Sequence, residues 1–151
     1  MIDRFERFSQ TISEISRYWH KIAADEMEKY DLKGPCAVYF TAMYRCPEGI
    51  TAARLGEVCA RDKSDVSRSV ADMERRGLVC RESGGNRYRA LLTLTEEGRQ
   101  VAEEINRRAA LAVEFGGRGL SDEQREVFYD ALERIANNLQ VVSEQGLPRN
   151  G

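Results

Sequence analysis

Residues 63–79 read KSDVSRSVADMERRGLV, and this stretch decides the fold. At about 100° per residue of a helix, Val66, Val70 and Met73 fall on one side. The opposite side carries small, hydroxyl and basic residues, with two more polar residues on its flanks: Ser64, Arg68, Ala71, Arg75, Ser67 and Asp72. The stretch therefore predicts an amphipathic helix that packs an apolar ridge inward and presents a Ser/Arg face outward.

Both ends of this helix are marked in the sequence. Asp62 can cap the N-terminus, and Gly77 can take the left-handed conformation that ends a helix, so that Leu78 folds back onto the core. A second, short helix is predicted just before it, following Thr51, and residues 61–63 connect the two. The apolar side of the short helix is expected to consist of Leu55, Val58 and Cys59.

A β-hairpin is predicted directly after the helix. The apolar period changes there from about 3.6 to about 2, so residues 78–82 and 87–94 are expected to be strands. The SGGN segment at residues 83–86 between them is typical of a hairpin turn. Three basic residues flank this turn: Arg81, Arg87 and Arg89.

Longer helices are predicted toward both ends of the chain. They are expected over residues 3–30, from Pro35 to before Cys46, from a cap at Thr95 to about residue 116, and from a capping box at Ser121–Gln124 onward. The first and last carry apolar residues at alternating spacings of three and four: Phe5, Phe8, Ile12, Ile15, Trp19 and Ile22, and Phe128, Leu132, Ile135, Leu139 and Val142. Stripes of this kind need a partner, from the same chain or from another.

Composition excludes several classes of protein. The chain has 151 residues, a formal charge of −2 and no apolar run near the ~20 residues of a membrane span. No signal peptide is recognisable, so we expect a cytoplasmic protein. Four cysteines without CxxC spacing and a single histidine argue against a zinc site. We find no Ser/His/Asp set and no phosphate-binding loop, and therefore expect neither an enzyme nor a cofactor.

Charge is concentrated in the middle of the chain. Residues 54–89 contain nine basic and six acidic residues, a net charge of +3, whereas the remainder has 14 basic and 19 acidic residues. A basic segment between acidic ends favours a local anionic partner. An ordinary solvated surface with many salt bridges is an equally open interpretation of charge alone.

The order of these elements favours a DNA-binding unit. A face of serines and arginines can enter a major groove, where arginine reaches guanine O6 and N7 or a phosphate. The short helix before it completes a helix-turn-helix, and the basic hairpin behind it forms a wing near the DNA backbone. The expected DNA-binding residues are Lys63, Ser64, Asp65, Ser67, Arg68, Arg75, Arg81, Arg87 and Arg89. Each element alone is also compatible with an ordinary amphipathic helix or hairpin.

Several of these segments, in this order and spacing, resemble the MarR family of bacterial transcriptional regulators. The matching pieces are GIT at 49–51, DKS at 62–64, VSR at 66–68, MERRGLV at 73–79, LTEEG at 94–98 and the last helix at 119–139. The resemblance implies a mainly α fold with a β-hairpin wing in a single domain. Residues 49–95 would form the winged-helix lobe, and residues 1–46 and 96–145 the dimerisation helices. It also implies a homodimeric regulator, expected to be a repressor, on a palindromic operator.

The resemblance further implies regulation by a small aromatic or lipophilic ligand. Candidates for the pocket are Tyr18, Trp19, His20, Tyr39, Phe40 and Met43, although most of them could equally be core residues. A redox trigger has weaker support because no cysteine precedes Cys36. Cys36 itself lies at a helix N-terminus, which can lower the pKa of a thiol, but a small buried residue is the simpler interpretation.

The sequence departs from the family pattern at two places. Asn86-Arg87-Tyr88 stands where the family often has Asp-Arg-Arg in the wing, and Asp65 stands where a neutral residue is common. Asp65 could accept a hydrogen bond from cytosine N4, but its place in the first turn favours a capping role. The acidic residue and the acidic composition keep open an alternative, a winged-helix protein-interaction module that has lost DNA binding.

Overall fold

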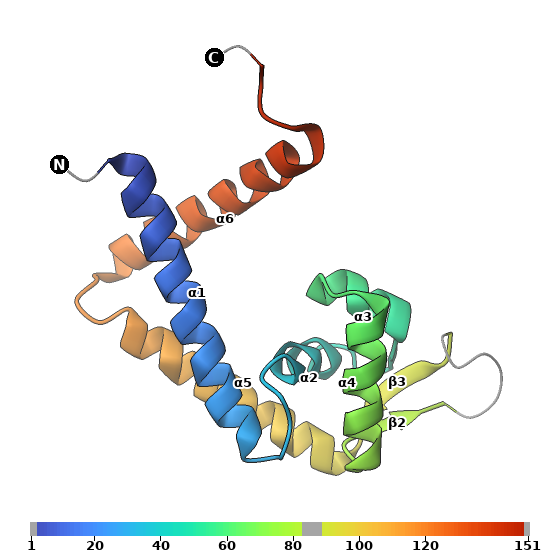
Figure 1. Cartoon of the computed structure of the whole chain (residues 1–151). Coiled ribbons are helices and arrows are strands. Elements are labelled where there is room, and N and C mark those ends of the chain that lie inside the picture. The colour runs from blue at the N-terminus through green and yellow to red at the C-terminus, as the bar shows by residue number, and fades with distance from the viewer. Residues whose placement is uncertain (1–2, 83–88, 150–151) are drawn as a thin grey trace. The chain divides into compact units, whose positions relative to one another are not determined.

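The computed structural model describes residues 3–82 and 89–149. The chain divides into two compact units, residues 1–110 and residues 111–151, with the boundary inside the fifth helix. Figure 1 shows the helices and strands along the chain. The helices are α1 (Arg4–Glu28), α2 (Cys36–Tyr44), α3 (Ala52–Cys59), α4 (Lys63–Arg75), α5 (Glu96–Gly116) and α6 (Asp122–Gln145). The predicted helices are confirmed, as is the mainly α fold with a small sheet.

The sheet has three antiparallel strands in the order β1-β3-β2. Its strands are β1 (Ile50–Thr51), β2 (Val79–Arg81) and β3 (Leu91–Leu94), and Ile50 and Arg81 both face Leu92 across the ladder. The sequence did not predict β1, because two residues are too few to show an alternating pattern. The short strand joins the segment before α3 to the hairpin, and so ties the lobe together.

The second hairpin strand is shorter than predicted. It was expected over residues 87–94 but begins at Leu91, while residues 83–88 lie outside the described part. At this end of the described ladder, the N–H of Leu91 donates to the side-chain carboxylate of Glu82 at 3.3 Å. The N–H of Glu82 still donates to the carbonyl of Leu91 at 2.9 Å.

The ends of the helices follow local capping chemistry as predicted. Asp62 Oδ1 accepts a hydrogen bond from the N–H of Asp65 at 2.7 Å, and Thr51 Oγ1 accepts one from Arg54. Gly77 has a φ of 72°, the left-handed conformation that ends α4. Ser121 and Gln124 form a capping box at the start of α6, in which each side chain accepts the backbone N–H of the other residue.

The core of the first unit places α4 as the sequence requires. Val66, Val70 and Met73 are buried, so the apolar ridge faces inward and the prediction is confirmed. The other core residues come from α1, α2, α3, α5 and the sheet with its flanking residues, among them Met27, Tyr39, Phe40, Met43, Leu55, Leu78, Leu92, Val101 and Ile105.

One side chain of α3 was placed wrongly. Val58 was expected on the apolar side, but it is 44% exposed. The helix is rotated so that Gly56 faces α4, where an added Cβ would lie 3.0 Å from the carbonyl oxygen of Arg61 and 3.3 Å from Val66. Both contacts would be tighter than usual for a Cβ, so this close approach favours glycine. It directs Leu55 into the core and Val58 outward.

The second unit contains the end of α5 and all of α6. No residue of α6 is buried within the described chain, and Phe128, Ile135 and Leu139 of its apolar stripe are exposed. The turn before α6 is fixed by Arg125, whose guanidinium contacts Glu114 and the carbonyl of Gly117, each at 3.0 Å.

Candidate nucleic-acid interface and adjoining cavity

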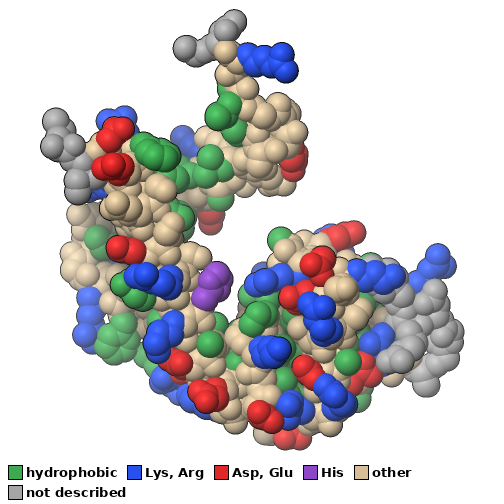
Figure 2. Space-filling model, in the orientation of Figure 1, with side chains coloured by type: hydrophobic (Ala, Val, Ile, Leu, Met, Phe, Trp, Pro, Cys, Tyr) green, Lys and Arg blue, Asp and Glu red, His purple; other side chains and the backbone are tan. Residues whose placement is uncertain are grey.

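Helix α4 presents a polar face to the surface because its apolar face is buried in the core. The exposed residues of this helix are those the sequence placed opposite the apolar ridge, together with the first residue: Lys63, Ser64, Ser67, Arg68, Ala71 and Arg75. Small side chains leave the helix backbone approachable between the two arginines. Basic and acidic side chains are interspersed over the lobe in the view of Figure 2. This view therefore shows no extended basic surface.

The two arginines of this face differ in their contacts. Arg75 forms an ion pair with Asp72, one turn earlier, and its side chain remains exposed. Arg68 is exposed and has no ion-pair partner among residues 3–82 and 89–149. Arg68 therefore has a guanidinium whose donors are available to an external acceptor.

Arg81 of the hairpin has a structural role. Its Nη2 atom lies 2.8 Å from Glu74 Oε1, and its Nε atom also donates to that oxygen at 3.3 Å. Both side chains are largely buried, so the pair fastens β2 to α4. Arg89 is exposed just before β3, while Arg87 lies outside the described residues.

Asp65 differs from the other predicted interface residues. Its carboxylate does not cap α4, since Asp62 fills that role. Instead it accepts a hydrogen bond from the hydroxyl of buried Tyr39, and Ser69 Oγ lies 3.5 Å from the same oxygen. Asp65 is half-buried and its carboxylate is directed into the lobe. Tyr39 was expected in a ligand pocket, and its contact with Asp65 was not predicted because the two residues are 26 positions apart and no local pattern connects them.

A cavity of about 460 Å³ adjoins the lobe within the first unit. It lies between α1, α2, α3 and α5 and is mostly apolar, with polar atoms from a few side chains. Its lining includes Trp19, Ile22, Ala23, Glu26, Val38, Thr41, Ala42, Arg45, Val58, Cys59, Asn106, Arg108 and Ala109. The exposed Val58 is therefore part of a cavity wall.

Of the six predicted pocket residues, only Trp19 lines this cavity. Tyr39, Phe40 and Met43 are buried core residues, and Tyr18 and His20 are exposed. The helical period gives the reason. The face of α1 that continues from Trp19 consists of Ile22, Ala23 and Glu26, at positions three, four and seven residues later, so the residues on either side of Trp19 point elsewhere.

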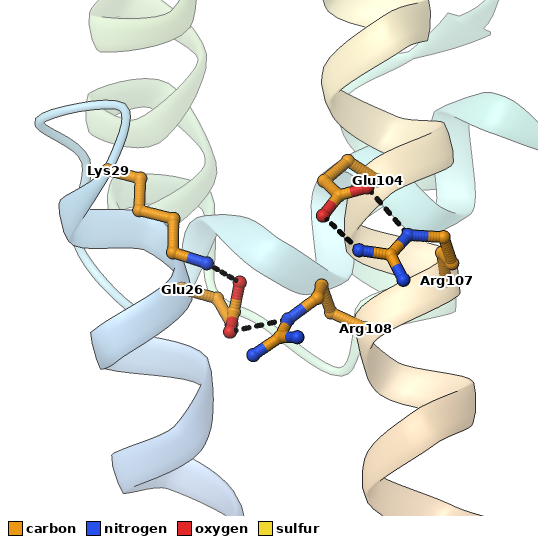
Figure 3. A network of polar contacts seen from close by, with 5 residues as sticks. All are labelled: Glu26, Lys29, Glu104, Arg107 and Arg108. Carbon is orange, nitrogen blue, oxygen red and sulfur yellow. Dashed lines mark hydrogen bonds and ion pairs between the residues drawn. The ribbon is translucent and has the colours of Figure 1, made fainter.

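Glu26 and Arg108 line the cavity and belong to a group of ion pairs that Figure 3 shows. Glu26 of α1 accepts hydrogen bonds from Lys29 Nζ at 2.6 Å and from Arg108 Nε of α5 at 2.9 Å. The hydrogen bond from Lys29, reinforced by Arg108, lowers the pKa of the Glu26 carboxyl. One turn away, Arg107 pairs with Glu104 at 2.7 Å. The Glu26–Arg108 pair thus joins α1 to α5 at the edge of the cavity.

Two thiols of the first unit, Cys36 and Cys59, have a raised pKa. Burial raises the pKa of the Cys36 thiol, and it also raises the pKa of Cys59 at the cavity wall. The simpler interpretation of Cys36 as a small buried residue is confirmed. Among the described residues, no group of three or more His, Cys, Asp or Glu side chains could hold a metal ion, and no helix is long and apolar enough to cross a membrane.

Comparison with known proteins rests on structure. No protein-family model matches the sequence, and no curated protein is significantly similar to it. A MarR-family transcriptional regulator from Listeria monocytogenes, solved in complex with a 26mer DNA, is 22% identical, with 100% of each chain covered and a TM-score of 0.79. A MarR transcriptional regulator from Methanosarcina mazei Go1 is 22% identical, with 93% of this chain and 94% of that chain covered and a TM-score of 0.79.

The chain has the MarR-type winged-helix fold. A further similar structure is the complex of Staphylococcus aureus MepR with DNA, which is 20% identical and covers 87% of this chain and 97% of that chain, with a TM-score of 0.77. Within the MarR-type fold, α3 and α4 form the helix-turn-helix and β2 and β3 belong to the wing. The sequence resemblance is thereby confirmed at the level of the fold.

Proposed function

We propose that this chain is a sequence-specific DNA-binding transcriptional regulator, acting as a homodimeric repressor on a palindromic operator. The observation that carries the proposal is the orientation of α4 in the fold. Its apolar ridge is buried, and its exposed side is made of serines, an alanine and basic residues within a MarR-type fold. Two structures of this fold that resemble the chain were solved with DNA.

The roles of the residues follow from their contacts. Arg68, which is exposed and without an ion pair among the described residues, is the candidate for reading a guanine, with Ser64 and Ser67 beside it. Lys63, Arg75 and Arg89 are candidates for phosphate contacts. Arg81 pairs with Glu74 and links the wing to α4, and the Asp65 carboxylate faces inward. We therefore propose no contact with a DNA base for either residue.

Selection of duplexes from a random pool tests DNA binding and operator symmetry together. With the selected duplex, Arg68→Ala should lose about 1–3 kcal/mol of binding free energy and discriminate less between sequences. Arg134→Ala removes the same charge from exposed α6 and is the matched control. The assignment of Arg68 fails if its variant binds as tightly and selectively as the parent.

The homodimer is proposed from the apolar stripes. Phe5, Ile12 and Ile15 of α1 are exposed, as are Phe128 and Leu139 of α6. Contiguous apolar faces of this size are seldom left in water, so a second copy is their proposed cover. Sedimentation should show a dimer for the parent and for Ser13→Glu, and a monomer for Ile12→Glu. A parent that sediments as a monomer at micromolar concentration would exclude the dimer.

Ligand control is proposed at the cavity between α1, α2, α3 and α5. A mostly apolar volume of about 460 Å³ suits a small lipophilic or aromatic molecule, and its few polar groups can orient one. The cavity borders both α3, which packs on α4, and the Glu26–Arg108 pair. Occupancy is therefore expected to change the affinity for DNA.

The alternative of a protein-interaction module has one observation in its favour. The formal charge is −2, and acidic side chains lie among the basic ones on the lobe (Figure 2). Salt dependence separates the two functions, since a protein that contacts several phosphates loses affinity steeply as salt rises. Absence of duplex binding even at low salt would favour the interaction module.

A further inference from the structure

We propose that Tyr39 is a positioning residue for the DNA-binding helix: its hydroxyl holds the Asp65 carboxylate inside the lobe, away from the surface that α4 presents to DNA. The inference rests on the proposed function and adds to it a residue that does not touch DNA. It also gives a role to Asp65, the acidic residue in the first turn of a helix whose exposed side chains are mainly serines and basic residues.

The geometry places the two side chains on different elements. Tyr39 lies in the middle of α2 and is fully buried, and its hydroxyl donates to Asp65 Oδ1 in the first turn of α4. Ser69, one turn further along α4, is also buried and has its hydroxyl 3.5 Å from the same carboxylate oxygen. Two hydroxyl groups, from Tyr39 and Ser69, therefore lie within hydrogen-bonding distance of Asp65 Oδ1.

The carboxylate is available for this contact because it is not needed at the helix end. Asp62 already caps α4 by accepting the N–H of Asp65. Burial, and then the hydrogen bond to Asp65, raises the pKa of Tyr39 above its ordinary value, so the phenol keeps its proton and remains a donor. Each partner satisfies the other, since a buried hydroxyl without an acceptor is itself costly.

The electrostatic consequence concerns DNA directly. Asp65 is preceded by exposed Ser64 and followed two residues later by exposed Ser67. A carboxylate released from Tyr39 would be free to turn toward that surface and would repel phosphate groups. While the Tyr39 hydroxyl donates to it, the Asp65 carboxylate stays directed into the lobe. The bond also fixes the start of α4 on α2.

The test uses three variants of the full chain and the duplex selected by the parent. Tyr39→Phe keeps the ring in the core and removes the hydroxyl. It should bind about 3–10-fold more weakly, because the carboxylate loses its partner. Asp65→Asn in the same background removes the released charge and should restore affinity to within about twofold of the parent. Near-ultraviolet circular dichroism checks that each variant is folded.

Three outcomes overturn the inference while the parent binds DNA. The first is parental affinity for Tyr39→Phe. The second is a double variant as weak as Tyr39→Phe, which would mean that the loss came from altered packing. Asp65→Asn alone keeps an acceptor for Tyr39 and should change affinity by less than about twofold. The third outcome is a gain of about tenfold for Asp65→Asn alone, which would show that the carboxylate opposes DNA even while Tyr39 holds it. A parent that selects no duplex overturns the proposed function, and this inference with it.

Discussion

The hydroxyl of Thr95 donates a hydrogen bond to the carbonyl oxygen of Gly77 at 2.7 Å. The same oxygen atom of Thr95 accepts the N–H of Gly98 at 3.0 Å, in the first turn of α5. One side chain therefore joins the glycine that ends α4 to the start of α5. Because β2 and β3 leave and return between these two points, Thr95 closes the base of the hairpin.

Removal of this hydroxyl should destabilise the lobe. Thr95→Ala is expected to lower the free energy of unfolding by about 1–2 kcal/mol, since it removes a helix cap and leaves the Gly77 carbonyl without that donor. Thr95→Ser retains the hydroxyl and serves as the control. Urea unfolding followed by far-ultraviolet circular dichroism measures both. Equal midpoints for the Ala and Ser variants would mean that the hydroxyl contributes nothing.

Gly98 lies where α5 comes close to Leu78, just after the end of α4. A Cβ at this position would be 1.9 Å from the carbonyl oxygen of Leu78, an impossible contact without movement of the backbone. Gly98→Ala should therefore lower stability by about 3 kcal/mol or prevent folding. Gly116→Ala, in the same helix but with no neighbouring atom within 4 Å, should be neutral or stabilising. Similar unfolding curves for the two variants would contradict the close approach.

The Glu26 network predicts a pH dependence of stability. Lys29 and Arg108 lower the pKa of Glu26 below 4.5, and the Glu26 side chain is only 16% exposed. A group with a lowered pKa in the folded state stabilises the protein above its unfolded pKa, and this contribution disappears as pH falls through the folded pKa. The stability advantage of the parent over Glu26→Gln should thus be present at pH 7 and shrink below about pH 4.5.

Chemical unfolding at a series of pH values measures this difference. Glu28→Gln, exposed on the same helix, removes an equal charge and is the control for general electrostatics. If the parent and Glu26→Gln differ in free energy of unfolding by the same amount at pH 7 and at pH 3, ionisation of Glu26 does not contribute to stability.

Local patterns predicted most of the fold. The helices were recognisable because their apolar period and their caps, such as Asp62 and Ser121, are encoded within a few residues. The two-residue strand β1 was not, because it exists only by pairing with β3, about 40 residues later. Val58 was misplaced for a similar reason, since the rotation of α3 depends on how closely Gly56 can approach α4.

The candidate interface was predicted only as a surface. Helical periodicity identified which residues of α4 face outward, Arg68 among them, without any knowledge of their partners. Two members of the predicted set have contacts that sequence spacing cannot reveal, Arg81 with Glu74 and Asp65 with Tyr39. Both contacts join separate elements, so they depend on tertiary packing.

The cavity offers a direct optical test, because Trp19 lines it and is the only tryptophan in the chain. A fluorescent probe of apolar sites, such as the amphipathic anion 8-anilinonaphthalene-1-sulfonate, should bind there and quench or shift the emission of Trp19. Ala109 lines the cavity and Ala110, the next residue of α5, does not. Ala109→Leu fills part of the volume and should weaken the probe's affinity by about tenfold, corresponding to about 1.4 kcal/mol.

The matched variant Ala110→Leu adds the same atoms on an exposed position and should bind the probe as the parent does. Because the two variants differ by one position on one helix, general effects of a larger side chain on α5 cancel between them. Equal probe affinity for both variants, with unchanged Trp19 emission, would place the probe elsewhere. A loss confined to Ala109→Leu would locate binding in the cavity between α1, α2, α3 and α5, beside the Glu26–Arg108 pair.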